Sequence, residues 1–182
     1  MPSVVLGITG GIAAYKAPEL VRLFKKAGIE VICVPTAEAL EFVTPLTLRT
    51  LSENPVYTDL FFESKNPAEK ITHIGLAQNC DLIVIAPATA NIIGKIACGI
   101  ADDLLTTVVM ASDKKVMIVP AMNTKMWENP IVASNVEKLK KLGYIFCGPV
   151  KGRLACGDSG VGHIEDTAEI FSRAAELLKK KK

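Results

Sequence analysis

Aromatic residues are scarce in this chain: they make up 5% of its 182 residues, with a single tryptophan. Positive charge is limited too, since the formal net charge is +2 and the last four residues are all lysine. Without that tail the body carries a net charge of about −2. Nucleic-acid-binding surfaces combine a basic face with interleaved aromatic side chains. The composition therefore excludes a nucleic-acid partner of that kind.

Paired cysteines are also missing. The count of five is odd and no C-x-x-C pair occurs, so the sequence predicts neither a disulfide framework nor a metal site. Cys156 stands apart, because it lies in a glycine-rich segment beside Asp158. The other four lie in apolar strand or helix segments, where we expect inert core residues: Cys33, Cys80, Cys98 and Cys147.

Long hydrophobic runs are absent, and none approaches the roughly 20 residues that a membrane-spanning helix needs. The first residues lead directly into a predicted strand and do not resemble a secretory leader. We therefore expect a cytoplasmic protein that does not associate with membranes.

What the chain has in quantity is Val, Ile, Leu and Ala, within an apolar fraction of 49%. Short apolar runs alternate with helical patterns, which predicts one domain over residues 1–182 with an α/β fold. We expect a doubly wound, mostly parallel sheet in a three-layer α/β/α arrangement of the Rossmann-like or flavodoxin-like kind. The predicted strands are residues 3–8, 30–34, 81–86, 115–119 and 144–147. The predicted helices are residues 11–27, 36–51 (broken at Pro45), 72–79, 90–98, 103–112, 130–142 and 166–180, and residues 54–67 are expected to be irregular.

Glycine-rich residues 7–16 join the first strand to the first helix, a place where backbone amides can face an anion. The segment is neither a Walker loop nor G-x-G-x-x-G. The second strand ends in Val34-Pro35-Thr36, without the acidic residue that binds the ribose of NAD. A mononucleotide such as FMN therefore fits better than NAD, and a tight turn without a ligand stays as the alternative.

Three further features have both a structural and a functional interpretation. Thr89 and Asn91 follow the third strand and could bind a ligand, or Thr89 could simply cap a helix. Asp102 and Asp103 could stabilise a helix start or lie near a cofactor or subunit contact. His73 could be an ordinary surface residue or a proton-transfer group.

Two strings near the carboxyl ends of later strands indicate a substrate site. The first is Pro120-Ala-Met-Asn-Thr-Lys-Met-Trp127, in which Asn123 can bind a carboxylate while Met122 and Trp127 suit core packing. The second is Leu154-Ala-Cys-Gly-Asp-Ser-Gly-Val-Gly-His163, in which three glycines in six residues allow close approaches. Ligands of doubly wound folds bind beyond the carboxyl ends of the strands, so we expect both strings at one site.

With these two strings the chain closely resembles the flavin-dependent cysteine decarboxylases, over residues 4–169. The resemblance implies a flavodoxin-like fold, FMN bound at a subunit interface, and homotrimers often assembled into dodecamers. It implies decarboxylation of 4′-phosphopantothenoylcysteine to 4′-phosphopantetheine in coenzyme A biosynthesis. The thiol carbon is oxidised to a thioaldehyde, carbon dioxide leaves, and the resulting enethiol is reduced again, with the cofactor supplying the redox chemistry.

The same resemblance implies roles for individual residues. His73 would be the base or orienting group, Cys156 the proton donor in a lid, and Asn123 the ligand of the substrate carboxylate. Met126 and Ala155 would contact the substrate. The implied FMN-binding residues are Gly10, Gly11, Ile12, Thr36, Thr89, Ala90, Asn91, Ile92 and Ala121.

One departure concerns His163, which stands where that family usually has arginine. Many bacterial members are also fused to a synthetase that makes the substrate, so we expect either a separate synthetase partner or a fused one. The competing interpretations are a decarboxylase of peptide C-terminal cysteines, a non-catalytic flavoprotein that regulates a phosphatase, and a flavodoxin-type electron carrier.

Overall fold

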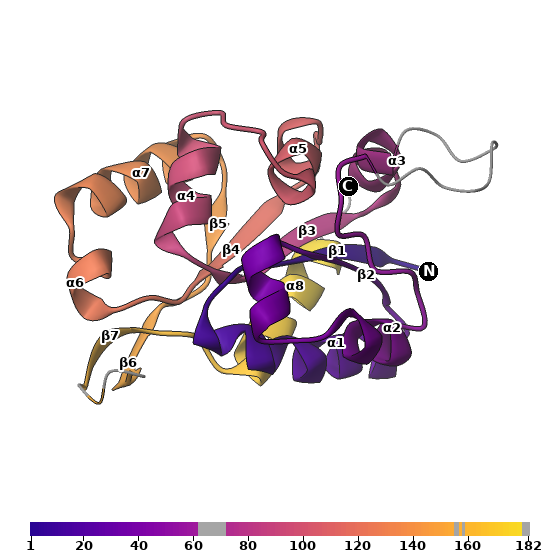
Figure 1. The fold of residues 1–182 in the computed structure, drawn as a ribbon, viewed down its shortest axis with the longest axis horizontal. Helices are drawn as coiled ribbons and strands as arrows, with labels where there is room; N and C mark the ends of the chain where they lie inside the picture. The colour runs from indigo at the N-terminus through magenta and orange to yellow at the C-terminus, as the bar shows by residue number, and fades with distance from the viewer. Residues whose placement is uncertain (62–71, 155–156, 158, 180–182) are drawn as a thin grey trace.

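Five parallel strands form a central sheet in the order β2-β1-β3-β4-β5 (Figure 1). The computed structural model describes residues 1–61, 72–154, 157 and 159–179. All five predicted strands are present, which confirms the flavodoxin-like α/β fold. Their bounds are β1 Ser3–Ile8, β2 Glu30–Pro35, β3 Leu82–Ala88, β4 Val116–Pro120 and β5 Ile145–Phe146.

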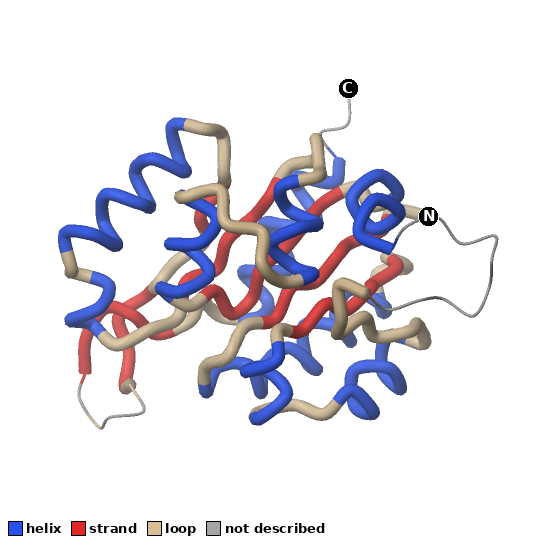
Figure 2. The backbone as a smooth tube through the Cα atoms, turned by 45° about the horizontal axis from the view of Figure 1, so that its top comes forward, coloured by secondary structure: helices blue, strands red, loops and turns tan. Residues whose placement is uncertain are grey.

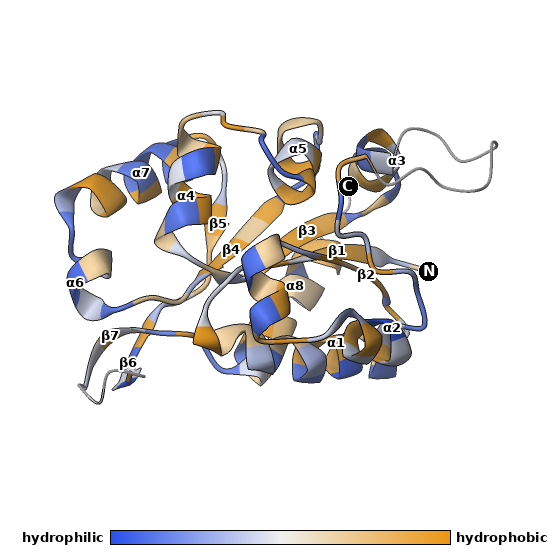
Figure 3. Cartoon of the chain, in the orientation of Figure 1, coloured by the Kyte–Doolittle hydropathy of each residue, from blue (hydrophilic) through white to orange (hydrophobic). Residues whose placement is uncertain are grey.

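Helices cover both faces of this sheet, as the tube view in Figure 2 makes visible. Successive residues of a strand point to opposite faces, so Val4 and Leu6 pack into one core cluster and Val5 into the other. Both clusters are almost entirely aliphatic, and β3 and β4 are coloured as hydrophobic in Figure 3. This explains why the strands read as continuous apolar runs rather than as alternating ones.

The helices divide between the two core clusters. On one face lie α1 Ala17–Lys26, α2 Pro45–Ser52 and α8 Thr167–Lys179, with Phe24 of α1 edge-on to Phe171 of α8. On the other lie α3 Thr72–Asn79, α4 Ala90–Ala97, α5 Leu104–Met110 and α7 Pro130–Lys141. None of the helices in the described residues has the length and apolar character needed to cross a membrane.

The predicted helix at residues 11–27 is two elements, a 3₁₀ helix η1 at Ile12–Lys16 followed by α1. Pro18 lies in the first turn of α1, where its missing N–H is tolerated. The predicted break at Pro45 is confirmed, since a 3₁₀ helix η2 at Ala37–Glu41 precedes α2. β3 runs to Ala88, two residues beyond the predicted end.

A small antiparallel ribbon, formed by β6 Val150–Arg153 and β7 Ser159–His163, was not predicted. The lid that the resemblance implies lies around Cys156, outside the described residues, while residues 159–163 of the same glycine-rich string are a strand. A short helix, α6 Thr124–Trp127, was also missed, and it lies beside β7. The ribbon projects from the sheet near the carboxyl ends of its strands (Figure 1).

Candidate functional site

Two adjoining cavities open at the carboxyl edge of the sheet, where the sequence predicted the site. The first, here called the glycine cradle, has a volume of about 410 Å³, and the second, the ribbon cleft, about 550 Å³. Both volumes lie in the range of small-molecule sites. The cavities share Gly11, Ala121 and Met122.

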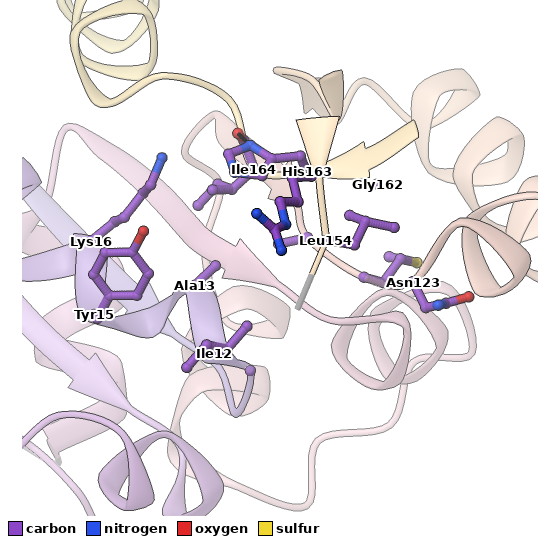
Figure 4. A pocket seen from close by; sticks show the side chains of 13 residues that line it. Ile12, Ala13, Tyr15, Lys16, Asn123, Leu154, Gly162, His163 and Ile164 are labelled. Atoms are coloured by element: carbon purple, nitrogen blue, oxygen red, sulfur yellow. Dashed lines mark hydrogen bonds between the residues drawn. The ribbon is translucent and has the colours of Figure 1, made fainter. Parts of the chain in front are cut away.

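The cradle is built from the loops after β1, β2 and β3 and from the segment after β4. It is lined by Thr9, Gly10, Gly11, Thr36, Glu38, Thr89, Ala90, Asn91, Ile92, Asp103, Ala121, Met122 and Met126. The cleft lies between η1, the end of β4 and the ribbon (Figure 4). It is lined by Gly11, Ile12, Ala13, Tyr15, Lys16, Ala121, Met122, Asn123, Arg153, Leu154, Gly162, His163 and Ile164.

Thr9 ties the first and third loops of the cradle together. Its hydroxyl donates to the carbonyl of Pro87 over 2.8 Å and accepts from the backbone N–H of Thr89 over 3.0 Å. The Thr89 hydroxyl in turn accepts from the N–H of Ile92 and caps α4. The capping interpretation of Thr89 is therefore confirmed, and the same residue also lines the cradle.

Thr36 lies at the end of β2 with its hydroxyl oxygen buried and without a hydrogen-bond partner. A buried hydroxyl normally finds a partner, so a polar group of a ligand would complete this site. Gly10 is required for a steric reason: a Cβ at this position would overlap Glu38 on η2. The first and second loops can therefore approach closely only with glycine at position 10.

Asn123 follows β4 and caps α6, with its Oδ1 accepting from the backbone N–H of Lys125 over 2.8 Å. This bond fixes the amide at the mouth of the ribbon cleft. The backbone N–H of Met122 donates to the carbonyl of Gly162 over 2.9 Å, which joins β7 to the same segment. Met122 and Trp127 pack against the core as predicted, although Met122 also lines both cavities.

The glycines of β7 are needed for close packing. A Cβ at Gly162 would overlap the carbonyl oxygen of Met122, and a Cβ at Gly160 would overlap the Thr124 hydroxyl. Gly162 also has a φ of +146°, which favours glycine. Residues 159–163 of the glycine-rich string thus form a strand that packs against the segment containing Asn123.

The acidic pair after α4 mainly stabilises helix α5. Asp103 forms a capping box with Thr106, and Lys95 makes ion pairs with Asp102 at 2.8 Å and Asp103 at 3.2 Å. The hydrogen bond from Lys95 lowers the pKa of the Asp102 carboxyl, and the bond to Asp102 raises the pKa of Lys95. The structural interpretation of Asp103 is confirmed, while its place in the cradle wall keeps it near a bound ligand.

Three of the four cysteines predicted to be inert are buried free thiols. Burial raises the pKa of Cys33 to about 12 and those of Cys80 and Cys147 to about 11, so these thiols stay protonated near neutral pH. The prediction was wrong for Cys98, which is exposed because it caps the end of α4. Ala155 and Cys156 lie outside the described residues.

Within a single chain, His73 lies at neither cavity of the site. It lies on α3, its ring Nδ1 is buried without a hydrogen-bond partner, and it lines neither cavity. Sequence reasoning also missed Lys16 and Arg153, which both line the ribbon cleft. Their positions were the available signal, since Lys16 ends the glycine-rich segment 7–16 and Arg153 directly precedes the string that begins at Leu154.

The sequence profile of the Flavoprotein family matches residues 1–179, and the chain belongs to this family. Within it, the chain is 43% identical to the probable phosphopantothenoylcysteine decarboxylase of Streptococcus mutans, covering 96% of this chain and 98% of that protein. It is 47% identical to the coenzyme A biosynthesis bifunctional protein CoaBC of Bacillus subtilis, covering 94% of this chain and 42% of that protein. The chain spans less than half the length of the CoaBC relatives that it matches.

Solved structures are similar over the whole chain. A PPC decarboxylase cysteine-to-serine mutant, complexed with pantothenoylaminoethenethiol, has a TM-score of 0.90 at 36% identity and covers 98% of this chain and 99% of its own. The FMN-binding protein AtHal3 has a TM-score of 0.87 at 36% identity, with coverage of 100% and 98%. These similarities confirm the predicted fold and the predicted family.

Two glycine substitutions test the close packing of β7 against the backbone of Met122. We expect Gly162→Ala to lower the free energy of unfolding by about 3 kcal/mol, because overpacking adds to backbone strain. Gly99→Ala is the matched control: φ is +70° there but a Cβ would meet nothing within 4 Å, so about 1 kcal/mol is expected. Urea unfolding measures both, and equal losses would contradict the close-packing argument.

Proposed function

We propose that this protein catalyses the FMN-dependent decarboxylation of 4′-phosphopantothenoylcysteine to 4′-phosphopantetheine. The observation that carries the proposal is Asn123, fixed by its helix cap at the mouth of the ribbon cleft beside the cradle. The similarity to phosphopantothenoylcysteine decarboxylases over nearly the whole chain supports the substrate. The enzyme would be a carboxy-lyase of coenzyme A biosynthesis.

The glycine cradle fits FMN. The buried, unpartnered hydroxyl of Thr36 offers a hydrogen bond to a phosphate oxygen, and glycines at 10 and 11 allow a ligand to approach the backbone. Ala121 lies at the boundary with the cleft. When bound there, FMN supplies two-electron oxidation of the thiol carbon and the later return of those electrons. The cradle residues that would hold it are Gly10, Gly11, Thr36, Thr89, Ala90, Asn91, Ile92 and Ala121. Ile12, which the resemblance also implies, lines the adjoining cleft.

The protein's own residues would bind the substrate and move protons. Asn123 binds the carboxylate through its amide, which can donate hydrogen bonds as well as accept them. Met126 and Ala155 contact the substrate, and Cys156 donates the final proton to carbon. His73 acts as the base or orienting group. Oxidation of the thiol carbon to a thioaldehyde provides the electron sink for the pair released with carbon dioxide.

The position of His73 favours an oligomer in which a neighbouring copy completes each site. Large apolar side chains are exposed around the two cavities, with Ile12 57% and Tyr15 60% exposed. We therefore propose a homotrimer, or a dodecamer built from trimers, in the cytoplasm. The bifunctional relatives favour a phosphopantothenoylcysteine synthetase as the partner that supplies the substrate.

Mass spectrometry of the FMN-loaded protein with 4′-phosphopantothenoylcysteine tests the reaction. The expected outcome is a product lighter than the substrate by the mass of one carbon dioxide. Cys156→Ser should release carbon dioxide but accumulate the enethiol, because the final proton is not delivered. Turnover of a peptide with a C-terminal cysteine instead would favour the peptidyl-cysteine alternative, and failure on both substrates would favour a non-catalytic flavoprotein.

Asn123→Asp tests the carboxylate contact. We expect kcat/KM to fall by about tenfold or more, since two like charges would then meet in the cleft. Asn129→Asp is the matched control, because Asn129 caps α7 through a backbone N–H two residues ahead in the same way. Aspartate preserves both caps, so only Asn123→Asp should lose activity, and equal kinetics in the two variants would remove Asn123 from the site.

Thr36→Val tests the cofactor cradle. We expect FMN affinity, measured by flavin fluorescence titration, to fall about tenfold because a hydrogen bond to an anionic phosphate is lost. Unfolding of the FMN-free protein should not become easier, since the deleted hydroxyl has no partner there. Thr50→Val removes an exposed hydroxyl on α2 and should leave FMN affinity unchanged. Unchanged affinity in Thr36→Val would place the phosphate elsewhere.

A further inference from the structure

The charge of the glycine cradle opposes the cofactor that we propose for it. Two carboxylates, from Glu38 and Asp103, line the cradle, and none of its described lining residues is Lys, Arg or His. The phosphate of FMN adds a charge of about −2 at neutral pH. Like charges repel, so a positive charge close behind this lining would favour the bound cofactor.

Lys95 provides such a charge directly behind the wall. Its Nζ lies 3.2 Å from Oδ2 of the lining residue Asp103 and 2.8 Å from Oδ1 of Asp102. Lys95 is also on α4, four residues after Asn91 and three after Ile92, which both line the cradle. Residues at this spacing share one face of a helix, so Lys95 follows the lining residues on the same side of α4.

The carboxylate of Asp103 is fixed in the wall by its hydrogen bonds. Its Oδ1 accepts from the backbone N–H and from the hydroxyl of Thr106, each over 2.8 Å, and its Oδ2 accepts from Lys95. Both oxygens are therefore held while the capping box of α5 is intact. The negative charge cannot turn away from a ligand and has to be balanced where it lies.

Partial burial makes this pair matter more than an ordinary surface ion pair. The side chains of Lys95 and Asp103 are 21% and 28% exposed, whereas those of Lys140 and Glu137, which pair on α7, are 51% and 63% exposed. Partly buried charges are screened less by water and salt. Loss of Lys95 would leave Asp103 without an ion-pair partner among the described residues.

We propose that Lys95 acts through Asp103 as the countercharge of the cradle, and that this pair sets the affinity for the anionic cofactor. Lys95 is thus a positioning residue, since it does not itself line the cavity. The inference rests on the proposed function, because that function places FMN in the cradle. A pair that only joined α4 to α5 would affect charged and uncharged flavins equally.

The test is fluorescence titration of the flavin-free full chain with FMN and with riboflavin, which has the same flavin ring but no phosphate. Lys95→Gln should weaken FMN binding about tenfold and leave riboflavin binding nearly unchanged. Asp103→Asn should act in the opposite direction and tighten FMN binding, because asparagine keeps the cap of α5 but removes the charge. Loss of an ion pair alone would not give opposite signs for its two partners.

Two further variants separate charge from packing. The double variant Lys95→Gln with Asp103→Asn keeps the summed formal charge of the wild-type pair, so it should restore the ratio of FMN to riboflavin affinity. Lys95→Arg keeps the cation and should also retain this ratio. Lys140→Gln is the matched control, because it breaks a lysine–glutamate pair of 3.3 Å on a helix that does not line the cradle.

Equal weakening of both flavins by Lys95→Gln, or a shift of the ratio in the same direction by Lys95→Gln and Asp103→Asn, would overturn the proposal. Failure of the proposed function gives a different result. A protein with the expected opposite shifts that does not decarboxylate the cysteine substrate would retain the countercharge and reject the reaction. A protein that decarboxylates with an unshifted ratio in both variants would retain the reaction and reject the countercharge.

Discussion

The hydrogen bond from the Met122 N–H to the Gly162 carbonyl is the contact on which the site depends. It forms because two backbones meet without an intervening side chain, and a Cβ at Gly162 would overlap the carbonyl of Met122. The bond seats the ribbon against the end of β4. As a result, β7 and η1 line the cleft from two sides, and Asn123 is held in the same lining.

The topology explains why this contact can join such distant parts of the chain. Parallel strands all end at one edge, so the loops after β1, β2, β3 and β4 converge there. Thr9 links two of those loops directly. The loops of the site are therefore held by the central sheet, and the ribbon of β6 and β7, which is a separate sheet, completes the cleft.

Much of this arrangement could be predicted from the sequence, because buried parallel strands require continuous apolar runs and Leu82 to Ala86 is such a run. The ribbon could not be predicted in the same way. The segment of residues 159–163 is short and contains two glycines. Its strand is stabilised by pairing with β6 and by contact with α6, and not by an apolar face.

The places of some single residues could not be predicted from the sequence, for similarly local reasons. Cys98 has apolar neighbours, but a helix end turned it outwards. Lys16 looked like an ordinary residue of a helix, whereas the 3₁₀ turn places it in the cleft wall. The role of His73 stays a prediction: the residue was chosen for its type and for the resemblance, and the sequence pattern does not show that it lines neither cavity of a single chain.

The identity of residue 123 follows from two requirements met at once. Either asparagine or aspartate can accept the Lys125 N–H and cap α6. Only asparagine adds donors, which a carboxylate ligand needs, without adding a negative charge to a cleft whose described wall has none. In the proposed reaction, the uncharged amide would bind the carboxylate that must leave without a full positive charge. A cation at position 123 would stabilise that carboxylate before carbon dioxide departs, and would oppose its loss.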